Sequence, residues 1–227
     1  YGLVAPRGLT TIAFLMHAPP APFIPEERIG EPVLLIGAVF VGSQEDGEAA
    51  MAPLRALAKP VADAIGVMPY PAIYQLTEAA EAPHGAAIRN TFMDVVPGDL
   101  IDDILVALDR ATTPFSFIQL RPLGGAMFER DVEATAFRHS DRAYFVPIIG
   151  LWFEESPVEP HQAWTEDLWE KFQPYRAGNY VNFLDEEGDA RIRDAYGAKA
   201  LTRLAQVKAK WDPENLFSRN QNIRPHS

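Results

Sequence analysis

The order of the apolar segments constrains the fold of this chain more than any other feature of its sequence. Short runs rich in β-branched and aromatic residues, typical of strands, are mixed irregularly with segments whose apolar residues recur at helical spacing. A parallel doubly wound sheet would require a regular succession of strand, helix and strand. The sequence therefore predicts an α+β fold, with helices covering one face of an antiparallel sheet and an irregular C-terminal tail.

Strands are predicted where apolar runs are bounded by proline, glycine or polar residues. They cover Thr10–His17, Pro32–Val41, Phe115–Arg121, Arg142–Phe153 and Asn179–Leu184. We expect the fourth strand to bend at Pro147 or Gly150, because proline cannot donate a hydrogen bond to the sheet ladder.

Helices are predicted over Glu48–Leu57, from Gly98 to about Leu108, from about Pro160 to Pro174, and over Asp189–Trp211. The second has apolar residues at helical spacing, namely Ile101, Ile104, Leu105 and Leu108, with Asp99 expected as its N-cap. The third carries Trp164, Leu168 and Phe172 on one side. A break is allowed at Gly197 in the fourth, which Asp212-Pro213 ends.

Composition limits the classes of partner. The 227 residues are 48% hydrophobic, enough for a sizeable core, and no uninterrupted apolar run is long enough to span a membrane. The start of the sequence lacks the pattern of a signal peptide, so we expect a cytoplasmic protein with no membrane partner. The net charge of −11, with no basic cluster, argues against nucleic-acid binding.

Several catalytic classes have no support. The chain has no cysteine, and its five histidines show no spacing typical of a metal site, so we expect no metal. Gly124-Gly125-Ala126 is too short for a dinucleotide-binding fingerprint, and no serine lies in the setting of a nucleophile elbow.

The segment Asn179–Phe183, with the sequence NYVNF, is the sharpest local pattern. In a strand, Tyr180 and Asn182 would share one face while Val181 and Phe183 share the other. The two polar heads are either an ordinary solvated surface or a pair that faces a ligand. A phenol ionises only near about pH 10, so a tyrosine acting as a base at neutral pH needs a nearby positive group or hydrogen-bond donor.

Two further patterns could line a site. Phe115, Phe117, Gln119 and Arg121 would share one face of their strand, as a pocket lining or as core residues whose polar neighbours reach water. The ending DPENLFSRNQN, residues 212–222, places three consecutive amides after an apolar anchor. Amides can contact the edge of a heterocycle such as flavin, and they are equally common in turns.

Taken together, the segments between Pro32 and Pro225 resemble the berberine bridge enzyme-like FAD-linked oxidases, of the vanillyl-alcohol oxidase type of flavoprotein. The matching motifs follow the family order: Met68-Pro69-Tyr70, Tyr74-Gln75-Leu76, Gly124-Gly125-Ala126, Ala134–Phe137 with His139, Trp152, Tyr180–Phe183, Ala195-Tyr196-Gly197, and Lys208 to Ile223. The Tyr-x-Asn motif and the Asp-Pro to Asn-Gln-Asn ending are the most specific.

The resemblance implies a substrate-binding domain over residues 1–185, followed by a berberine-like helix and flavin-facing tail over residues 186–227. It implies that Tyr180 takes a proton from a substrate hydroxyl while hydride passes to FAD. It implies flavin contacts from Asn182, Asn220, Gln221 and Asn222. Guesses for the substrate pocket are Tyr70, Gln119, Arg121 and Trp152.

The family's glycine-rich pyrophosphate segment and flavin-linking residues do not occur in this sequence. We therefore expect weak FAD binding by the chain alone, a missing or separate FAD-binding domain as partner, and a tendency to form homo-oligomers. The chain is expected to be a fragment, a truncated gene product or one subunit of a split enzyme. The leading hypothesis is the substrate-binding half of an FAD-dependent oxidoreductase acting on a small alcohol, sugar or phenolic compound. The alternative is a non-catalytic binding or scaffold module that keeps the fold without flavin.

Overall fold

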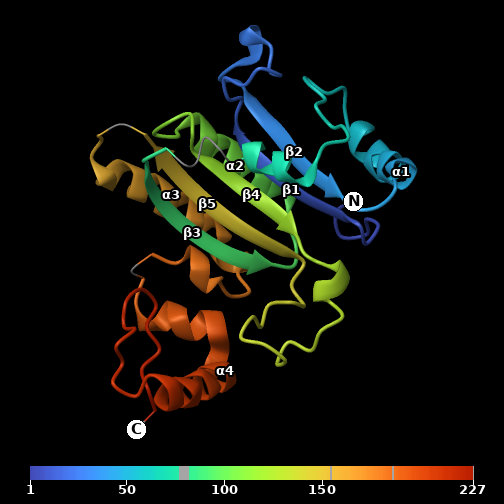
Figure 1. Cartoon of the computed structure of the whole chain (residues 1–227). Helices are drawn as coiled ribbons and strands as arrows, with labels where there is room; N and C mark the ends of the chain where they lie inside the picture. The colour runs from blue at the N-terminus through green and yellow to red at the C-terminus, as the bar shows by residue number, and fades with distance from the viewer. Residues whose placement is uncertain (77–81, 154, 186, 227) are drawn as a thin grey trace.

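A five-stranded antiparallel sheet forms the centre of the protein (Figure 1). The computed structural model describes residues 1–76, 82–153, 155–185 and 187–226. The strands lie in the order β2-β1-β4-β5-β3. Their bounds are β1 Leu9–His17, β2 Pro32–Phe40, β3 Gly85–Met93, β4 Phe117–Pro122 and β5 Tyr144–Trp152. All four pairs of neighbouring strands are antiparallel.

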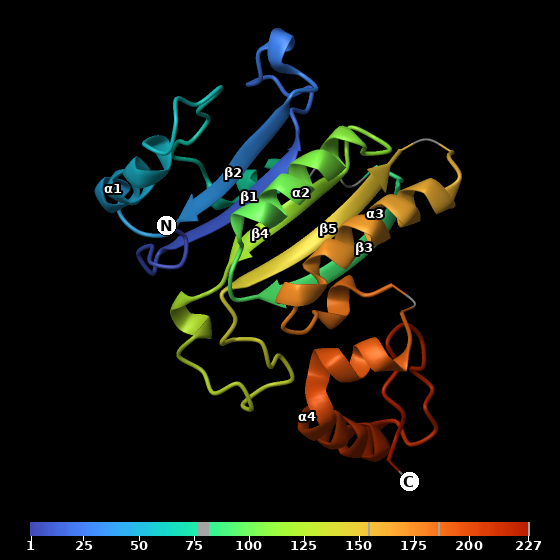
Figure 2. The ribbon, with the colours of Figure 1, turned by 180° about the vertical axis from the view of Figure 1, so that it is seen from behind.

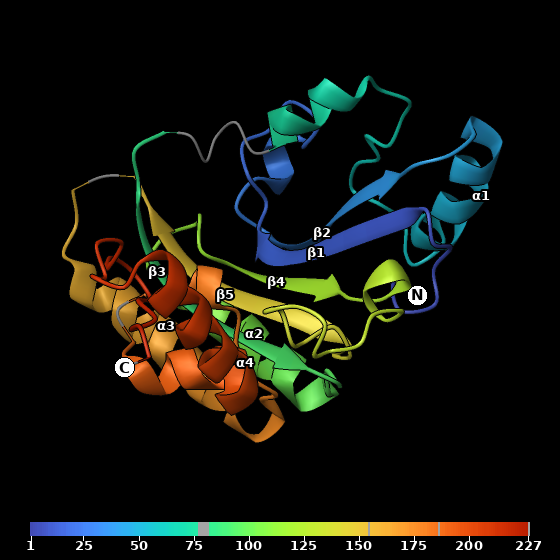
Figure 3. The ribbon, with the colours of Figure 1, turned by 60° about the horizontal axis from the view of Figure 1, so that its bottom comes forward.

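Two helices, α2 (Gly98–Asp109) and α3 (Val158–Phe172), cover one face of this sheet (Figure 2). The other helices lie at its margins: α1 (Gln44–Arg55) contacts the edge strand β2, and α4 (Asp189–Trp211) lies beyond β3. Short 3-10 turns include η2 (Tyr70–Leu76), on the side of the sheet opposite α2 (Figure 3), and η6 (Val181–Phe183). The arrangement confirms the predicted α+β class.

The main core lies between the sheet and these two helices. Ile118 of β4 and Ile148 of β5 point toward the helices and are completely buried. They pack with Ile104 of α2 and with Leu168 and Phe172 of α3. Burial of each such side chain contributes about 1.5–3 kcal/mol. The helical spacing of apolar residues predicted for α3 is confirmed.

The apolar face of α2 is rotated from the predicted one. Leu100, Ile104 and Leu108 are buried, whereas Leu105 is 44% exposed. Asp99 was predicted as the N-cap, which is wrong: Pro97 holds that position, and Asp99 is the second residue of the helix. The Asp99 carboxylate accepts the backbone N–H of Leu100 at 3.0 Å, favourable at a positive helix N-terminus.

Strand β3 was not predicted. Its sequence GAAIRNTFM breaks the apolar run with Arg89, Asn90 and Thr91, so no clear period of two is visible. The structure gives each of these polar side chains a partner. Arg89 pairs with Glu166 at 2.6 Å, and the side chains of Asn90 and Thr91 donate to backbone carbonyls. Tertiary contacts thus compensate for the polar residues of this edge strand.

The predicted strand Asn179–Leu184 is wrong. Tyr180 is extended, but Val181–Phe183 form the 3-10 turn η6. Backbone hydrogen bonds of the kind that pair strands end before Tyr180. The backbone N–H of Phe92 in β3 donates to the carbonyl of Gly178 at 3.0 Å, and the carbonyl of Phe92 accepts from Ala177 at 2.8 Å. Beyond that point the Asn90 side chain, rather than a backbone ladder, holds the segment.

Strand β5 runs without interruption through Pro147 and Gly150. The disturbance appears in its pairing with β4, where Ile118 pairs with Ile148 and the next aligned pair is Arg121 with Phe145. Proline has no N–H to donate, so the ladder is interrupted opposite Gln119 and Leu120.

The C-terminal elements agree with the sequence. Helix α4 covers the predicted range and has a non-helical residue at Gly197, where φ is 69°. Asp212 ends it and accepts the backbone N–H groups of Leu216 and Phe217. No helix in the described part of the chain is long and apolar enough to cross a membrane.

Candidate functional site

The second face of the sheet, opposite α2 and α3, carries the candidate site. Because side chains alternate along a strand, Phe117, Gln119 and Arg121 point away from the core that contains Ile118. Phe145 lies beside Arg121 in the pairing of β4 with β5. Phe115 was predicted to share this face, but β4 begins only at Phe117, and Phe115 instead packs edge-on against Phe153.

Arg121 and Gln119 form one polar unit on this face. The Nε–H of Arg121 donates to Oε1 of Gln119 at 2.7 Å, and Gln119 is only 6% exposed. The guanidinium carbon lies 5.6 Å from the ring centre of Phe145 and 5.2 Å from that of Phe183. Burial lowers the pKa of Arg121, and nearby Tyr180 opposes this effect. No carboxylate pairs with Arg121 in the described ranges.

The turn that carries Tyr180 is fixed by one buried amide. Oδ1 of Asn90 accepts the backbone N–H of Tyr180 at 2.6 Å, while Nδ2 of Asn90 donates to the carbonyl of Phe183 at 2.8 Å. Asn90 is fully buried. Both ends of η6 are therefore held by β3, which positions the Tyr180 side chain over the sheet.

The side chains of Tyr180 and Asn182 contact each other, but the 3-10 turn η6 brings them together rather than the alternation of side chains along a strand. Nδ2 of Asn182 donates to the phenol oxygen of Tyr180 at 2.8 Å. The phenol ring lies edge-on to Phe137 and Phe145, with ring centres 5.5 and 5.6 Å apart. The phenol oxygen of Tyr180 thus has Asn182 as a hydrogen-bond donor, and the Arg121 cation lies nearby.

His139 and Tyr196 complete the surroundings of Tyr180. The His139 ring stacks on Phe92 with centres 4.2 Å apart, and Nε2 lies 3.0 Å from the carbonyl of Ala195 in α4. Burial lowers the pKa of His139, which favours the neutral ring. Burial, with a smaller effect from Tyr180, raises the pKa of Tyr196. Tyr196 is therefore a neutral phenol near Tyr180.

Two residues guessed for the pocket lie apart from this group. Trp152 is at the opposite end of β5 from Phe145 and stacks on His161 of α3, with ring centres 4.1 Å apart. Tyr70 is 72% exposed in η2, where its ring contacts Tyr74. Neither has a described contact with Tyr180, so we do not include them in the site.

The three tail amides differ in their surroundings. Nε2 of Gln221 donates to the carbonyl of Leu184 at 2.7 Å, which ties the tail to the segment after η6. Asn220 is exposed and has a positive φ of 59°. Oδ1 of Asn222 is buried and has no partner within the described residues.

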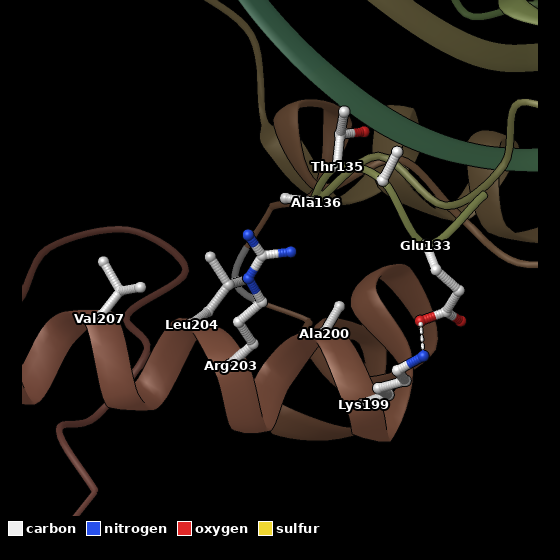
Figure 4. Close-up of a pocket in the computed structure, with 9 residues that line it drawn as sticks. Glu133, Thr135, Ala136, Lys199, Ala200, Arg203, Leu204 and Val207 are labelled. Carbon is white, nitrogen blue, oxygen red and sulfur yellow. Dashed lines mark ion pairs between the residues drawn. The ribbon is translucent and has the colours of Figure 1, made fainter. Parts of the chain in front are cut away.

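A surface cleft of about 230 Å³ lies between α4 and the loop at residues 133–136 (Figure 4). Its rim carries the ion pair of Lys199 with Glu133, at 3.1 Å. The Arg203 side chain extends from α4 into the cleft, toward the loop (Figure 4). An adjoining cleft of about 150 Å³ is lined in part by Tyr196 and Arg138. Neither cleft is lined by Tyr180 or Arg121.

The sequence did not reveal Asn90, Phe145 or Phe183, which hold or enclose Tyr180. Of these three residues, Asn90 was the easiest to find from the sequence. An asparagine between Arg89 and Thr91, inside an otherwise apolar stretch, needs hydrogen-bond partners when it is buried. Among the described residues, no three His, Cys, Asp or Glu side chains gather as a metal would require.

Comparisons with known proteins show which proteins this chain resembles in sequence and fold. The family model "Berberine and berberine like" matches residues 179–224. An FAD-linked oxidoreductase of Dictyostelium discoideum is 29% identical over 196 residues, which are 85% of this chain and 42% of that protein. Tetrahydroberberine oxidase of Berberis wilsoniae is 33% identical over 127 residues, covering 48% of this chain and 24% of that protein.

The solved structure of BBE-like #28 from Arabidopsis thaliana superposes with a TM-score of 0.76 at 19% identity, covering all of this chain and 52% of that one. The chain thus has the fold of part of a BBE-like protein and spans about half the length of such relatives or less. The resemblance found in the sequence is confirmed: residues 179–224 are a berberine-like segment, and the chain corresponds to a C-terminal portion of BBE-like FAD-linked oxidoreductases.

Proposed function

We propose that this chain is the substrate-binding half of an FAD-dependent oxidoreductase that oxidises a small alcohol, sugar or phenolic compound. The observation that carries this proposal is the hydrogen bond from Asn182 to the phenol oxygen of Tyr180, beside the Arg121 cation. The names of the relatives, which are FAD-linked oxidoreductases, support the redox class.

In the proposed reaction, the Tyr180 oxygen takes the proton of a substrate hydroxyl as the carbon–oxygen bond becomes a carbonyl. Asn182 donates a hydrogen bond to that oxygen, and the positive charge of Arg121 stabilises negative charge on it. Phe137 and Phe145 enclose the phenol ring and reduce its contact with water. FAD, when bound, supplies the acceptor for the hydride that leaves the same substrate carbon.

The residues of this chain fit one face of a flavin. An isoalloxazine ring needs a flat apolar surface and polar groups along one edge, and the second face of the sheet offers both. Phe145 of β5 and Phe183 of η6 are aromatic side chains on this face, and Asn182 is an amide candidate for the polar edge. We propose that a separate FAD-binding domain, the partner on this face, holds the rest of the cofactor.

Replacement of Tyr180 by Phe tests the catalytic role. The chain is assayed together with its FAD-binding domain, either encoded with it or supplied as a second polypeptide. The Y180F variant should bind FAD normally and lose about 10²–10⁴-fold in kcat/KM, the usual contribution of a general base. Y175F is the matched control, because the Tyr175 hydroxyl contacts Asp99 on α2. Full turnover by Y180F would exclude Tyr180 as the base.

The alternative, a non-catalytic module without flavin, is tested by colour and calorimetry. A flavoprotein absorbs near about 450 nm, and FAD binding produces heat. Absence of both signals when the chain and the FAD-binding domain are combined would favour the alternative.

A further inference from the structure

The Arg121 guanidinium has more hydrogen-bonding capacity than this chain uses. An arginine carries five N–H donors, and only Nε–H has a partner in the described part of the molecule, the Gln119 side chain. Nη1 and Nη2 form no hydrogen bond or ion pair there. Gln119, in turn, accepts through Oε1, and its own amide N–H groups have no partner among the described residues.

The surroundings of Arg121 are unusual for an unpaired cation. Other partly buried arginines have acidic partners: Arg191 lies 3.0 Å from Glu187, and Arg176 lies 3.0 Å from Asp194. Arg121 instead has the rings of Phe145 and Phe183 beside it. Aromatic faces attract a guanidinium but neutralise none of its charge. In a chain of net charge −11, a half-buried arginine with no acidic partner among the described residues is suited to pair with an anion from outside the chain.

We infer that Arg121 and Gln119 bind a carboxylate of the substrate, so that the compound oxidised at Tyr180 is an organic acid carrying its reactive hydroxyl elsewhere. The two terminal nitrogens of a guanidinium match the two oxygens of a carboxylate in a bidentate pair, and the Gln119 amide supplies a third donor. The aromatic rings Phe117 and Phe145, on the same face, suit an apolar body between the two groups. This inference rests on the proposed function and narrows its substrate class.

Binding of a carboxylate at Arg121 leaves Tyr180 with a donor of its own. The Asn182 amide donates to the Tyr180 oxygen at 2.8 Å and does not involve Arg121. Anchoring of the acid therefore uses Arg121 and Gln119, while the Asn182 hydrogen bond to the Tyr180 oxygen stays in place. The anchor also orients the substrate, since only a hydroxyl at a suitable distance from the carboxylate reaches Tyr180.

The test is a binding measurement on the 227-residue chain without flavin. Arginine-labelled protein is titrated with 3-phenylpropionate and, separately, with the neutral analogue 3-phenylpropan-1-ol, while the guanidinium signals are followed by NMR. We expect the Arg121 Nε–H signal to shift saturably with the acid, which should bind about tenfold or more tightly than the alcohol. Equal binding of the two compounds, or no shift at Arg121, would overturn the inference.

Variants separate charge from geometry. R121Q should remove the preference for the acid, and R121K should keep the charge but lose most of the bidentate gain, with several-fold weaker binding. R142Q is the control, because Arg142 pairs with Asp94 and Asp141 outside the site and should leave the preference unchanged. If R121Q does not fold, the comparison of acid with alcohol on the unmodified chain still decides.

Failure of this inference is distinguishable from failure of the proposed function. The probe titration requires neither FAD nor turnover, whereas the Y180F assay requires both. If the acid and the alcohol bind equally and Y180F is inactive, the proposed oxidoreductase function stands and its substrate is not an acid. If the acid binds tightly and Y180F is fully active, the carboxylate site is supported and Tyr180 is excluded as the base.

Discussion

Asn90 shows how a single buried side chain can determine the geometry of a site. Its amide oxygen and nitrogen hold the two ends of η6, at Tyr180 and Phe183, and its backbone carbonyl accepts from Arg191 at 3.2 Å. These bonds place Tyr180 relative to the sheet without any contact from Asn90 to the phenol. Asn90 is therefore a positioning residue.

Replacement of Asn90 by Ala should destabilise the protein and displace η6. The backbone groups of Tyr180 and Phe183 would lose their partners, at a cost of about 1–3 kcal/mol for each group left unsatisfied. Urea unfolding measures the loss, and NMR shifts of the 180–183 amides report the displacement. Q162A, which removes an exposed amide on α3, should change stability by less than about 0.5 kcal/mol. Unchanged amide shifts in N90A would contradict the positioning role.

Gly178 and Gly188 form a matched pair of glycines with positive φ, 110° and 82° respectively. A Cβ on Gly178 would clash with Cε1 of the buried His139, whereas no described atom lies within 4 Å of a Cβ on Gly188. G188A should therefore lose only the strain of holding a side chain at φ 82° and ψ 175°, a backbone region used almost only by glycine, about 1–3 kcal/mol. G178A should lose clearly more, as measured by urea unfolding, and equal losses would show that the His139 ring moves aside freely.

At the scale of elements, α4 is joined to the sheet and to α3 by a partly buried ionic cluster. Arg191 and Glu187 are 11% and 10% exposed and lie 3.0 Å apart, and the guanidinium of Arg191 lies 4.9 Å from the Trp169 ring centre. Arg176 approaches the same ring at 4.7 Å and pairs with Asp194. The cluster explains why a helix with few buried apolar residues stays attached.

Replacement of Glu187 by Gln should loosen this attachment. The change weakens one of the two acidic partners of the half-buried Arg191, which keeps Asp194 at 3.4 Å, and should cost about 1–2 kcal/mol. Hydrogen exchange should accelerate in α4 while strands β4 and β5 remain protected. E133Q breaks the exposed pair with Lys199 and should cost less than about 1 kcal/mol. Equal effects of the two variants would show that the cluster does not hold α4.

His139 gives the α4 contact a pH dependence. Its pKa in the folded protein is lowered by burial, so the unfolded chain binds the proton more strongly. The stability from the neutral ring is fully present above the ordinary histidine pKa of about 6.5 and is lost as the pH falls toward the lowered value. The free energy of unfolding should therefore decrease from pH 7.5 to 5.5 (about one unit on either side of that pKa), and less so in H139F. The same decrease in H139F would assign it to other groups.

Elements whose apolar residues recur at a regular spacing could be predicted from the sequence. Elements fixed by contacts between residues far apart in the sequence could not. Helix α3 has Trp164, Leu168 and Phe172 on one side, so its amphipathic pattern was sufficient. Strand β3 and turn η6 depend on each other through Asn90, and neither pattern was sufficient alone. In the candidate site, alternation correctly joined Gln119 with Arg121, whereas Tyr180 and Asn182 meet through a 3-10 turn.

For the molecule as a whole, the end of α4 presents large apolar side chains to solvent. Trp211, Leu216 and Phe217 are 75%, 75% and 83% exposed. Exposed apolar surface of this kind favours association. The second face of the sheet, by contrast, is partly closed by η6, whose Phe183 ring lies 5.1 Å from that of Phe145.

We expect the isolated chain to self-associate through the end of α4. Light scattering during gel filtration should show a concentration-dependent increase in mass, which W211S with F217S reduces because both side chains are largely exposed. V4S is the control, since Val4 is 82% exposed at the other end of the chain. An unchanged mass in the double variant would place any association elsewhere.

The two hydrogen bonds from the Asn90 side chain to the ends of η6 also affect how a two-part enzyme could be assembled. In the described part of the chain, the hydrogen bonds that position Tyr180 come from β3 and from η6 itself, so the phenol is in place before any flavin-bearing partner arrives. Such a partner would meet a finished surface and could join it as a rigid body, without the entropy loss of folding on contact. Two polypeptides could then share one active site by simple docking, and their rate of association would be set by diffusion and orientation rather than by a slow rearrangement.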